Sequence, residues 1–385
     1  MKIAIPKEIR EHETRVAASP QMVKKLAEMG VELAIETGAG LASAITDAAF
    51  EAAGAKIAAD AGAALAGADM VLKVARPMTA DEGSDEMALL PAGAVLVGLL
   101  APFQNRDQVA AYAARNVTAF AMELIPRISR AQGMDALSSQ SNLAGYKAVL
   151  DAAAEFGKVI PMMMTAAGTI APAKTLVLGA GVAGLQAIAT ARRLGSVVSA
   201  FDVRPAVKEQ VQSLGAKFVE VASEGAASAE TAGGYAREMG EDYQRRQREL
   251  IHDTIKAQDI VICTALIPGR PAPVLVTAEM VADMKPGAVI VDLASETGGN
   301  CELTEHGKVV RKDGVAIVAH ANVPGRVAVD ASPLYARNLL NFITPMIDAE
   351  TKALKIDWDD EIIAGACLTR DGKVVHPMLS DGGGS

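Results

Sequence analysis

The sequence is poor in aromatic residues, which make up only 3% of its 385 residues. Alanine and glycine are abundant instead, and small side chains allow helices and sheets to pack closely, which suits α/β layers better than a β-sandwich. A chain of this length exceeds one ordinary core and predicts two domains. The composition therefore favours a multidomain α/β protein.

Cysteine and positive charge are also scarce. The three cysteines, Cys263, Cys301 and Cys367, are scattered, so they form no disulfide framework and show no metal-ligand spacing. We therefore expect a reducing compartment and no metal site. The net charge of −9 argues against nucleic acid or an anionic membrane surface as a partner.

Long hydrophobic runs are missing as well. The apolar stretch at residues 87–103 comes nearest to membrane-spanning length, but it contains Pro91, Gly93, Gly98 and Pro102. It is better interpreted as a buried strand between turns than as a membrane helix. The first ten residues lack the apolar core of a signal peptide. We expect a chain without a membrane span, which still allows it to be a peripheral subunit.

The most informative stretch covers residues 174–202. A short apolar run, which predicts a buried strand, leads into a G-x-G-x-x-G motif at residues 179–184, and a helical pattern follows. In a dinucleotide-binding turn, Gly179 allows the tight bend, Gly181 leaves space for the pyrophosphate, and Gly184 lets the helix pack on the strand. Because the flanking elements agree with the motif, we predict a dinucleotide site.

The residues around this motif indicate which dinucleotide is bound. Val182 and Ala183 begin the predicted helix, whose free N–H groups and positive dipole end suit phosphate. Asp202 follows about 20 residues later, where a carboxylate accepts hydrogen bonds from a ribose and repels a 2′-phosphate. This favours NAD(H). Val203 and Arg204 come next, and an arginine at that point leaves NADP(H) open.

Strand and helix patterns alternate along residues 1–123, which predicts a first doubly wound, mostly parallel unit. A polar segment at residues 124–140 breaks this rhythm, and a long amphipathic helix at residues 141–156 follows as a bridge. We predict two Rossmann-like α/β domains linked by long helices. The first comprises residues 1–140 with 326–385 returning to it, and the second comprises residues 141–325.

The polar segment holds the densest group of functional side chains outside the glycine motif. Arg127, Gln132, Asp135 and Ser138 lie close together in sequence. A carboxamide such as that of nicotinamide needs both a donor and an acceptor, which this group provides. A plain solvated loop is the alternative.

Two further segments are candidates for contact with the nucleotide. Residues 222–240 are small, polar and glycine-rich, which predicts a mobile loop. Gly234 and Tyr235 in it have the character of a hinge and an apolar lid, although a surface loop with one tyrosine is the alternative. Ala265 and Leu266 follow a predicted strand and would contact the nucleotide through backbone and shape.

A general base for alcohol or amine oxidation is harder to identify. His320 ends a predicted strand, but one such histidine is more often structural. Lys73 stands inside an apolar strand, where a lysine is costly without a partner. Arg15, Lys73 and His320 could mark a substrate pocket, yet their spacing forms no acid–base–nucleophile set.

Several long segments carry a resemblance to a known family. They include IPKEIREHETRVAASP, VLKVARPMTADE, MELIPRISRAQGMDALSSQSNLAGYKAV, ETAGGYAREMG, TALIPGRPAPVLVT and MKPGAVIVDLASETGGN. Along nearly its whole length the chain resembles the alanine dehydrogenase/pyridine nucleotide transhydrogenase family. Within that family it closely resembles the NAD(H)-binding domain I, or alpha subunit, of proton-translocating transhydrogenases.

The resemblance implies roles for particular residues. It implies that Arg127, Gln132, Asp135 and Ser138 hold the nicotinamide end of NAD(H) for hydride transfer, and that the loop around Tyr235 closes over the nucleotide. The chain also departs from the alanine dehydrogenases at two places. Those enzymes carry a histidine after the strand matching residues 94–100, where this chain has none, and an aspartate in place of Glu296. Arg15 and Lys73 match their pocket residues.

We therefore expect an NAD(P) transhydrogenase subunit of the proton-translocating, Si-side/Re-side specific class. Hydride transfer between two nicotinamides moves no proton at the reacting carbons, so no general base is needed. NADP(H) would be bound by a partner domain III, and protons would cross a membrane domain II. The resemblance implies a homodimer, cytoplasmic and peripheral to the inner membrane. An alanine dehydrogenase-like enzyme and a non-catalytic NAD sensor are the alternatives.

Overall fold

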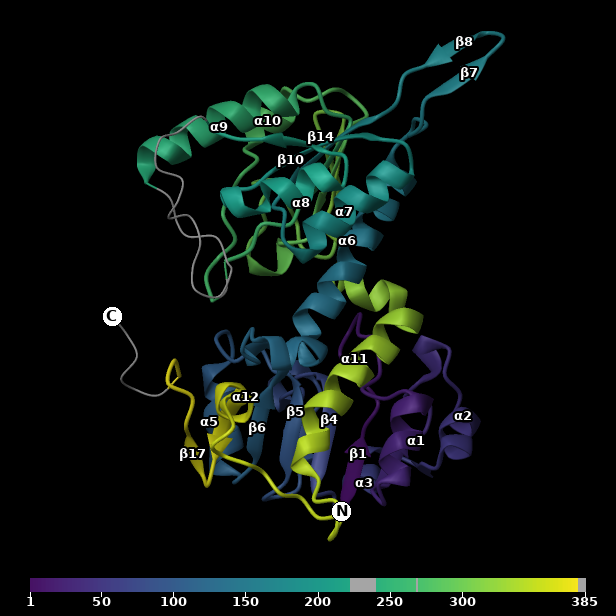
Figure 1. The fold of residues 1–385 in the computed structure, drawn as a ribbon, viewed down its shortest axis with the longest axis vertical. Helices are drawn as coiled ribbons and strands as arrows, with labels where there is room; N and C mark the ends of the chain where they lie inside the picture. Colours follow the sequence, from purple (N-terminus) through teal and green to yellow (C-terminus); the bar gives the residue numbers. More distant parts are fainter. Residues whose placement is uncertain (222–239, 268, 380–385) are drawn as a thin grey trace. The chain divides into compact units, whose positions relative to one another are not determined.

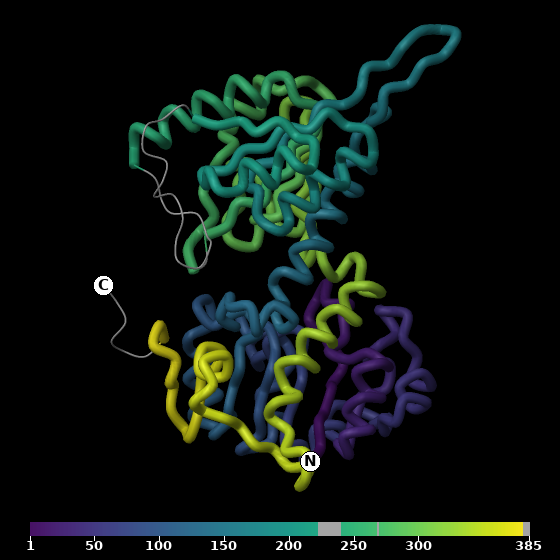
Figure 2. Tube along the Cα trace, viewed as in Figure 1, coloured from purple at the N-terminus to yellow at the C-terminus, as the bar shows by residue number. Residues whose placement is uncertain are grey.

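The computed structural model describes residues 1–221, 240–267 and 269–379 (Figure 1). The chain forms two compact units, of which unit 1 comprises residues 1–140 and 325–385 and unit 2 comprises residues 141–324. Figure 2 follows the trace from its purple start in unit 1 through unit 2, and the yellow C-terminal stretch lies again in unit 1. Each unit has its own sheet and its own core.

Unit 1 is built on an eight-stranded sheet with the order β17-β16-β6-β5-β4-β1-β2-β3. Strands β1 to β6 are parallel, whereas β16 and β17 add an antiparallel edge. The order β3-β2-β1-β4-β5-β6 is that of a Rossmann sheet. The strands are β1 (Lys2–Ile5), β2 (Glu32–Glu36), β3 (Lys56–Ala58), β4 (Met70–Ala75), β5 (Val95–Leu99), β6 (Thr118–Ala121), β16 (Cys367–Arg370) and β17 (Lys373–Val374).

Helices cover both faces of this sheet, because successive strand residues point to opposite sides. Leu72 belongs to the core under α1, α11 and α12, whereas Val71 belongs to the core under α3, α4 and α5. The helices are α1 (Pro20–Glu28), α2 (Asp47–Ala53), α3 (Ala61–Leu65), α4 (Glu86–Leu89), α5 (Arg106–Ala114), α11 (Ala328–Ile343) and α12 (Glu361–Ala366). The 3-10 turns are η1 (Leu41–Ser43), η2 (Ala80–Glu82), η3 (Met122–Leu124), η4 (Ser129–Met134), η8 (Val323–Val327) and η9 (Thr344–Met346).

Unit 2 repeats the arrangement with a seven-stranded sheet of order β11-β10-β9-β12-β13-β15-β14. Only β14 runs antiparallel to its neighbour. The strands are β9 (Lys174–Leu178), β10 (Val197–Phe201), β11 (Lys217–Val219), β12 (Ile260–Cys263), β13 (Val289–Asp292), β14 (Val309–Lys312) and β15 (Val315–Val318). Two Rossmann-like units with mostly parallel sheets confirm the predicted fold class.

The helices of unit 2 again form two layers. Val177 of β9 packs under α6, α7 and α8, and its neighbours Leu176 and Leu178 pack under α9 and α10. The elements are α6 (Ala136–Glu155), η5 (Pro205–Val207), α7 (Val182–Arg193), α8 (Lys208–Ser213), α9 (Glu241–Ile255), α10 (Ala278–Ala282) and η7 (Ser295–Thr297). Helix α6 begins at Ala136 rather than Ser141, so the unit boundary falls inside it.

A two-stranded hairpin extends from unit 2 as an arm (Figure 1). It consists of β7 (Met163–Thr165) and β8 (Gly168–Ile170), which pair in antiparallel register, and every residue of both strands is exposed. A methionine run of this kind is typical of a core or a subunit interface, and within this chain it is not core. None of the described helices is long and apolar enough to cross a membrane.

Candidate functional site

The glycine motif forms the predicted strand–turn–helix unit between β9 and α7. Gly179 has a φ of +98°, which an L side chain rarely adopts, and Gly181 caps α7. A Cβ atom on Gly184 would lie 1.9 Å from the Gly179 carbonyl oxygen, so only glycine lets α7 approach β9 this closely. At Gly181, in contrast, an added Cβ atom would meet nothing nearer than the Arg204 Nη2 atom at 4.0 Å. The turn therefore has open space next to Gly181.

The strand after this turn brings Asp202 back to it. The buried Asp202 carboxylate accepts a hydrogen bond from the Ala180 backbone N–H at 2.7 Å. It also accepts hydrogen bonds from the Arg204 backbone N–H and Nε at 2.9 Å and from Arg204 Nη2 at 2.8 Å. Val203, half-buried, packs against the core under α9. The structure thus brings the glycine motif, Asp202 and Arg204 together.

The loop after β12 lies beside the glycine motif. Thr264 Oγ1 donates to the Gly179 carbonyl oxygen at 2.9 Å, and a Cβ atom on Gly179 would lie 3.1 Å from the Ala265 nitrogen. Leu266 is exposed. Thr264 was not among the candidate residues, although its position directly after an apolar strand was a usable signal.

Asn300 is a second residue that sequence reasoning missed. Its buried amide accepts a hydrogen bond from the Ala265 backbone N–H at 2.9 Å and donates to the carbonyl oxygens of Ala265 at 2.9 Å and Pro273 at 2.8 Å. It therefore fixes the loop that carries Ala265 and Leu266. An asparagine after two glycines in a loop could have suggested such a role.

The polar segment of unit 1 is ordered around the start of α6. Asp135 accepts hydrogen bonds from the Ser138 backbone N–H at 2.8 Å and from the Ser138 hydroxyl at 2.5 Å, as a helix-capping carboxylate does. The Gly133 carbonyl oxygen accepts from Asn338 and Asn341 of α11. Gln132 lies in η4, directly before Gly133, and is exposed, as is Arg127.

Arg15 and Lys73, two of the three residues suggested as a substrate pocket, form ion pairs with carboxylates of the chain. Lys73 Nζ lies 3.1 Å from Glu8 Oε2 and 2.6 Å from Glu86 Oε1, with 1% of its side chain exposed. Burial lowers the pKa of Lys73, but the two carboxylates outweigh it and raise that pKa overall. Arg15 donates to Glu13 and Gln140. His320 belongs to unit 2, so it forms no cluster with them inside either unit.

Glu123 lies next to Ala101, which follows β5. By the resemblance, alanine dehydrogenases carry a histidine after this strand, and this chain has none. Glu123 follows β6, and its Oε1 atom accepts a hydrogen bond from the Ala101 backbone N–H at 2.5 Å. Among the described residues its Oε2 atom is buried without a hydrogen-bond partner. Burial raises the pKa of Glu123 to about 7. The sequence signal for it was an acid at a strand end.

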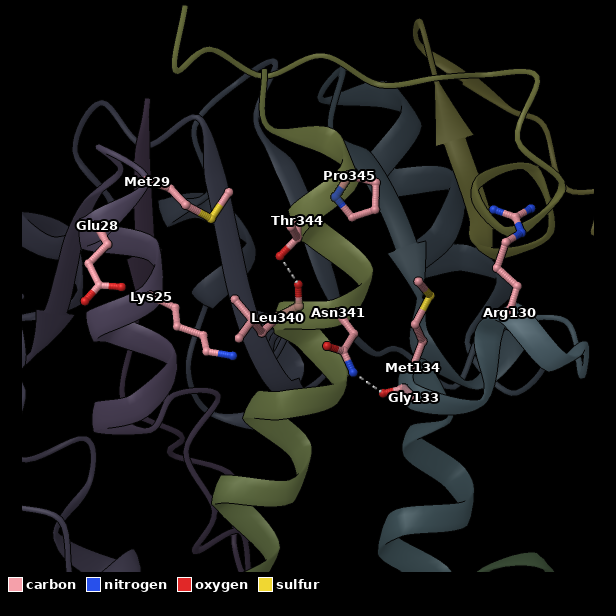
Figure 3. Close-up of a pocket in the computed structure, with 10 residues that line it drawn as sticks. All are labelled: Lys25, Glu28, Met29, Arg130, Gly133, Met134, Leu340, Asn341, Thr344 and Pro345. Carbon is pink, nitrogen blue, oxygen red and sulfur yellow. Dashed lines mark hydrogen bonds between the residues drawn. The ribbon is translucent and has the colours of Figure 1, made fainter. Parts of the chain in front are cut away.

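A pocket of about 620 Å³ in unit 1 is lined by residues of α1, η4, α11 and η9 (Figure 3). Figure 3 shows Asn341 bonded to Gly133 and Thr344 bonded to Leu340 along its wall. The pocket contains no predicted site residue, and it meets the polar segment only through Arg130, Gly133 and Met134. We therefore do not identify it with the nucleotide site.

Gly234 and Tyr235, with the rest of the predicted loop up to residue 239, lie outside the described residues. Within the described ranges no three His, Cys, Asp or Glu side chains are placed to hold a metal ion. The roles of the four polar residues of unit 1 and of the residues around the glycine motif therefore stay predictions.

The fold places the chain in the Rossmann class, and its glycine turn has the form that is typical of dinucleotide-binding members of that class. The model of the alanine dehydrogenase/PNT N-terminal domain matches residues 4–144, and that of the C-terminal domain matches residues 148–377. The chain belongs to the alanine dehydrogenase/PNT family, as the resemblance implied.

Individual relatives agree with this assignment. The chain is 61% identical over 383 residues to a protein from Rhodospirillum rubrum named for the NAD(P) transhydrogenase alpha subunit, with 100% of both chains covered. It is 32% identical to an alanine dehydrogenase from Bacillus subtilis, covering 99% of this chain and 94% of that one. A solved transhydrogenase structure from Sinorhizobium meliloti superposes with a TM-score of 0.87 at 51% identity, covering 97% of this chain and 100% of that one.

Proposed function

We propose that the chain is the NAD(H)-binding subunit of a proton-translocating NAD(P) transhydrogenase of the Si-side/Re-side specific class. The observation that carries the proposal is the open glycine turn with Asp202 beside it, in a chain 61% identical along its length to a transhydrogenase alpha subunit. NADP(H) would be bound by a partner domain III, and protons would cross a partner domain II. The subunit would work at the cytoplasmic side of the inner membrane through those partners.

The residues of unit 2 suit the adenosine half of NAD(H). Gly181 leaves the turn open to the pyrophosphate, and the N–H groups of Val182 and Ala183 lie in the first turn of a 12-residue helix. Gly179 and Gly184 shape the turn. Asp202, held by the Ala180 N–H, is the acceptor for the ribose.

The polar residues of unit 1 suit the nicotinamide half. Gln132 offers a donor and an acceptor to a carboxamide, and Arg127 adds a cation. Asp135 and Ser138 are locked together at the start of α6, so they present a preformed hydrogen-bonding edge. When bound, NADH supplies the hydride. The protein has to hold and orient the ring and exclude water, and it needs no base at the reacting carbon.

The paired cations argue for this proposal over an amino-acid dehydrogenase. Arg15 and Lys73 would have to bind a substrate carboxylate, but Glu13, Glu8 and Glu86 already neutralise them. Freeing buried charges from such pairs is costly. An amino-acid substrate would therefore find no uncompensated cation among these two side chains.

The test combines binding and transfer. NADH should bind the chain much more tightly than NADPH, and adding the membrane and NADP(H)-binding subunits should yield hydride exchange. Gln132→Asn should slow that exchange by roughly a hundredfold, because an Å-scale misplacement of the ring costs about that much, while NADH affinity changes little. Gln21→Asn, at an exposed glutamine of α1, is the control.

Three results would contradict the proposal in different ways. Unchanged exchange in Gln132→Asn would remove the role assigned to unit 1. Reduction of NAD by alanine without any partner would establish an amino-acid dehydrogenase. NADH binding with no exchange in the complete complex would leave an NAD sensor.

We also propose that the chain forms a homodimer through the hairpin arm. Met162, Met163, Met164 and Ile170 are 61%, 42%, 77% and 43% exposed, an unusual amount of apolar surface on one short arm. Met164→Asp should shift the sedimentation of the chain toward the monomer. Met378→Asp, at a methionine that is 58% exposed elsewhere, should not. A dimer that survives Met164→Asp unchanged would exclude this arm as the interface.

A further inference from the structure

The Asp202 carboxylate accepts four hydrogen bonds from within the chain. A carboxylate has about four lone-pair sites. Two are taken by the backbone N–H groups of Ala180 and Arg204, and two by the Nε and Nη2 atoms of the Arg204 side chain. A ribose diol must donate to the same oxygens. No acceptor site is left for it until one of these four bonds breaks.

The Arg204 side chain is the partner that can leave. The two backbone N–H groups belong to the glycine turn and to the chain beside Asp202, so they cannot move without unfolding the turn. The guanidinium reaches Asp202 through rotatable bonds, and 13% of the Arg204 side chain is exposed. Its Nη2 atom also lies 4.0 Å from where a Cβ atom of Gly181 would be. It therefore occupies the region that the ribose and pyrophosphate must enter.

We infer that Arg204 is a specificity-determining residue that competes with the adenosine ribose for Asp202, and that its guanidinium moves aside when the dinucleotide binds. This inference rests on the proposed NAD(H) site. It explains how one strand end can carry both an acid that selects a ribose and an arginine suited to a 2′-phosphate. With the guanidinium on it, Asp202 repels a 2′-phosphate less strongly. Arg204 therefore weakens NADH binding and narrows the preference for NADH over NADPH.

Two variants of Arg204 test the competition. Arg204→Leu removes the guanidinium and should bind NADH and 5′-AMP about tenfold more tightly, which corresponds to the loss of one moderately strong ion pair. It should bind 2′,5′-ADP and NADPH no more tightly than the original chain, because Asp202 is then uncompensated. Arg204→Lys keeps the positive charge but loses the paired N–H donors of the guanidinium. Its affinities should therefore lie between those of the original chain and those of Arg204→Leu.

The readout is isothermal titration with 5′-AMP, 2′,5′-ADP and NADH on the full chain. Arg193→Leu, at an exposed arginine in the last turn of α7, is the matched control and should leave all three affinities unchanged. Far-ultraviolet circular dichroism establishes that each variant is folded. If Arg204→Leu does not fold, the order of affinities in Arg204→Lys decides.

The outcomes separate this inference from the proposed function. Weaker or unchanged 5′-AMP binding in the Arg204 variants would overturn the competition and make Arg204 a direct ligand or a bystander, while hydride exchange in the complex would remain. Tighter 5′-AMP binding together with no exchange in the complete complex would support the competition and refute the transhydrogenase proposal.

Discussion

Replacing Glu123 by glutamine should change how the stability of unit 1 depends on pH. Burial raises the pKa of the Glu123 carboxyl from 4.5 to about 7, although three backbone N–H groups, those of Ala101, Leu100 and Glu123 itself, lower it in part. The folded chain therefore holds this proton between those two pH values and the unfolded chain releases it. The stabilising contribution is present below about pH 4.5 and is lost as the pH rises to about 7.

The size of the effect follows from the shift. A difference from 4.5 to about 7, at about 1.4 kcal/mol for each pH unit, is worth about 3 kcal/mol. Glu123→Gln cannot ionise. Its free energy of unfolding, relative to that of the original chain, should therefore rise by about that much as the pH increases from about 5 to about 8. Tyr112 and Tyr335 face the same region, but burial raises the pKa of each hydroxyl, so both stay neutral throughout.

The assay uses the single tryptophan of the chain. Trp358 stacks on Phe120 of β6, with ring centroids 6.2 Å apart, so its fluorescence reports the unfolding of unit 1 next to Glu123. Urea unfolding at several pH values gives the free energy of unfolding for each chain. Glu51→Gln, at an exposed acid of α2, is the control. Equal pH slopes for the original chain and Glu123→Gln would refute the argument.

Three further substitutions have clear outcomes. Gly184→Ala should destabilise unit 2 by about 3 kcal/mol or more, because its Cβ atom would lie 1.9 Å from the Gly179 carbonyl oxygen; a thermal midpoint like that of the original chain would contradict this. Gly181→Ala has room for its Cβ atom, so it should stay within about 1 kcal/mol in stability yet lose most of its NADH affinity; retained NADH binding would argue against a pyrophosphate at this turn. Lys73→Met leaves two buried carboxylates unpaired and should cost about 3–5 kcal/mol in urea unfolding near pH 7; a loss under about 1 kcal/mol would mean that water reaches them.

The strand–turn–helix unit around the glycine motif could be predicted because its signals are local. The motif itself predicts the roles of Gly179, Gly181 and Gly184 in the turn. Short apolar patterns predict the strand before it and the helix after it. The same holds for α1, which Ser19 and Pro20 start, as the side chain of Ser19 accepts a hydrogen bond from the Met22 N–H. In these places the local structure is determined by residues that lie only a few positions apart in the sequence.

The missed features depend on distant parts of the chain. Strand β16 is short, and it forms only because it pairs with β6, about 250 residues earlier. The run from Met162 to Met164 is apolar, but nothing in its pattern reveals that its side chains stay exposed on an arm. Helix α6 begins at Ala136, where Asp135 caps it, and not at residue 141 as predicted, because the polar residues up to 140 hid its first turn.

The candidate site was predicted in its residues but not in its bonding. Asp202 and Arg204 were both expected near the nucleotide, yet only the structure shows that one occupies the acceptor sites of the other. Likewise, Lys73 in an apolar strand predicted a partner, whereas the identity of Glu8 and Glu86 depends on how β1 and α4 approach β4. Side-chain geometry of this kind has no signature in a single sequence.

The return of the chain to unit 1 at residue 325 has a consequence for biosynthesis. Tyr335, Leu339 and Phe342 of α11 fill the same core as Ile3 and Leu72, so the sheet made first lacks some of its cover until α11 has been synthesised. Translation at about 5–20 residues per second takes on the order of ten seconds or more to pass through unit 2. Unit 2 is complete only at the end of that time, whereas the apolar face of the nascent unit 1 stays partly uncovered throughout it and has to be kept from aggregation until α11 has been added.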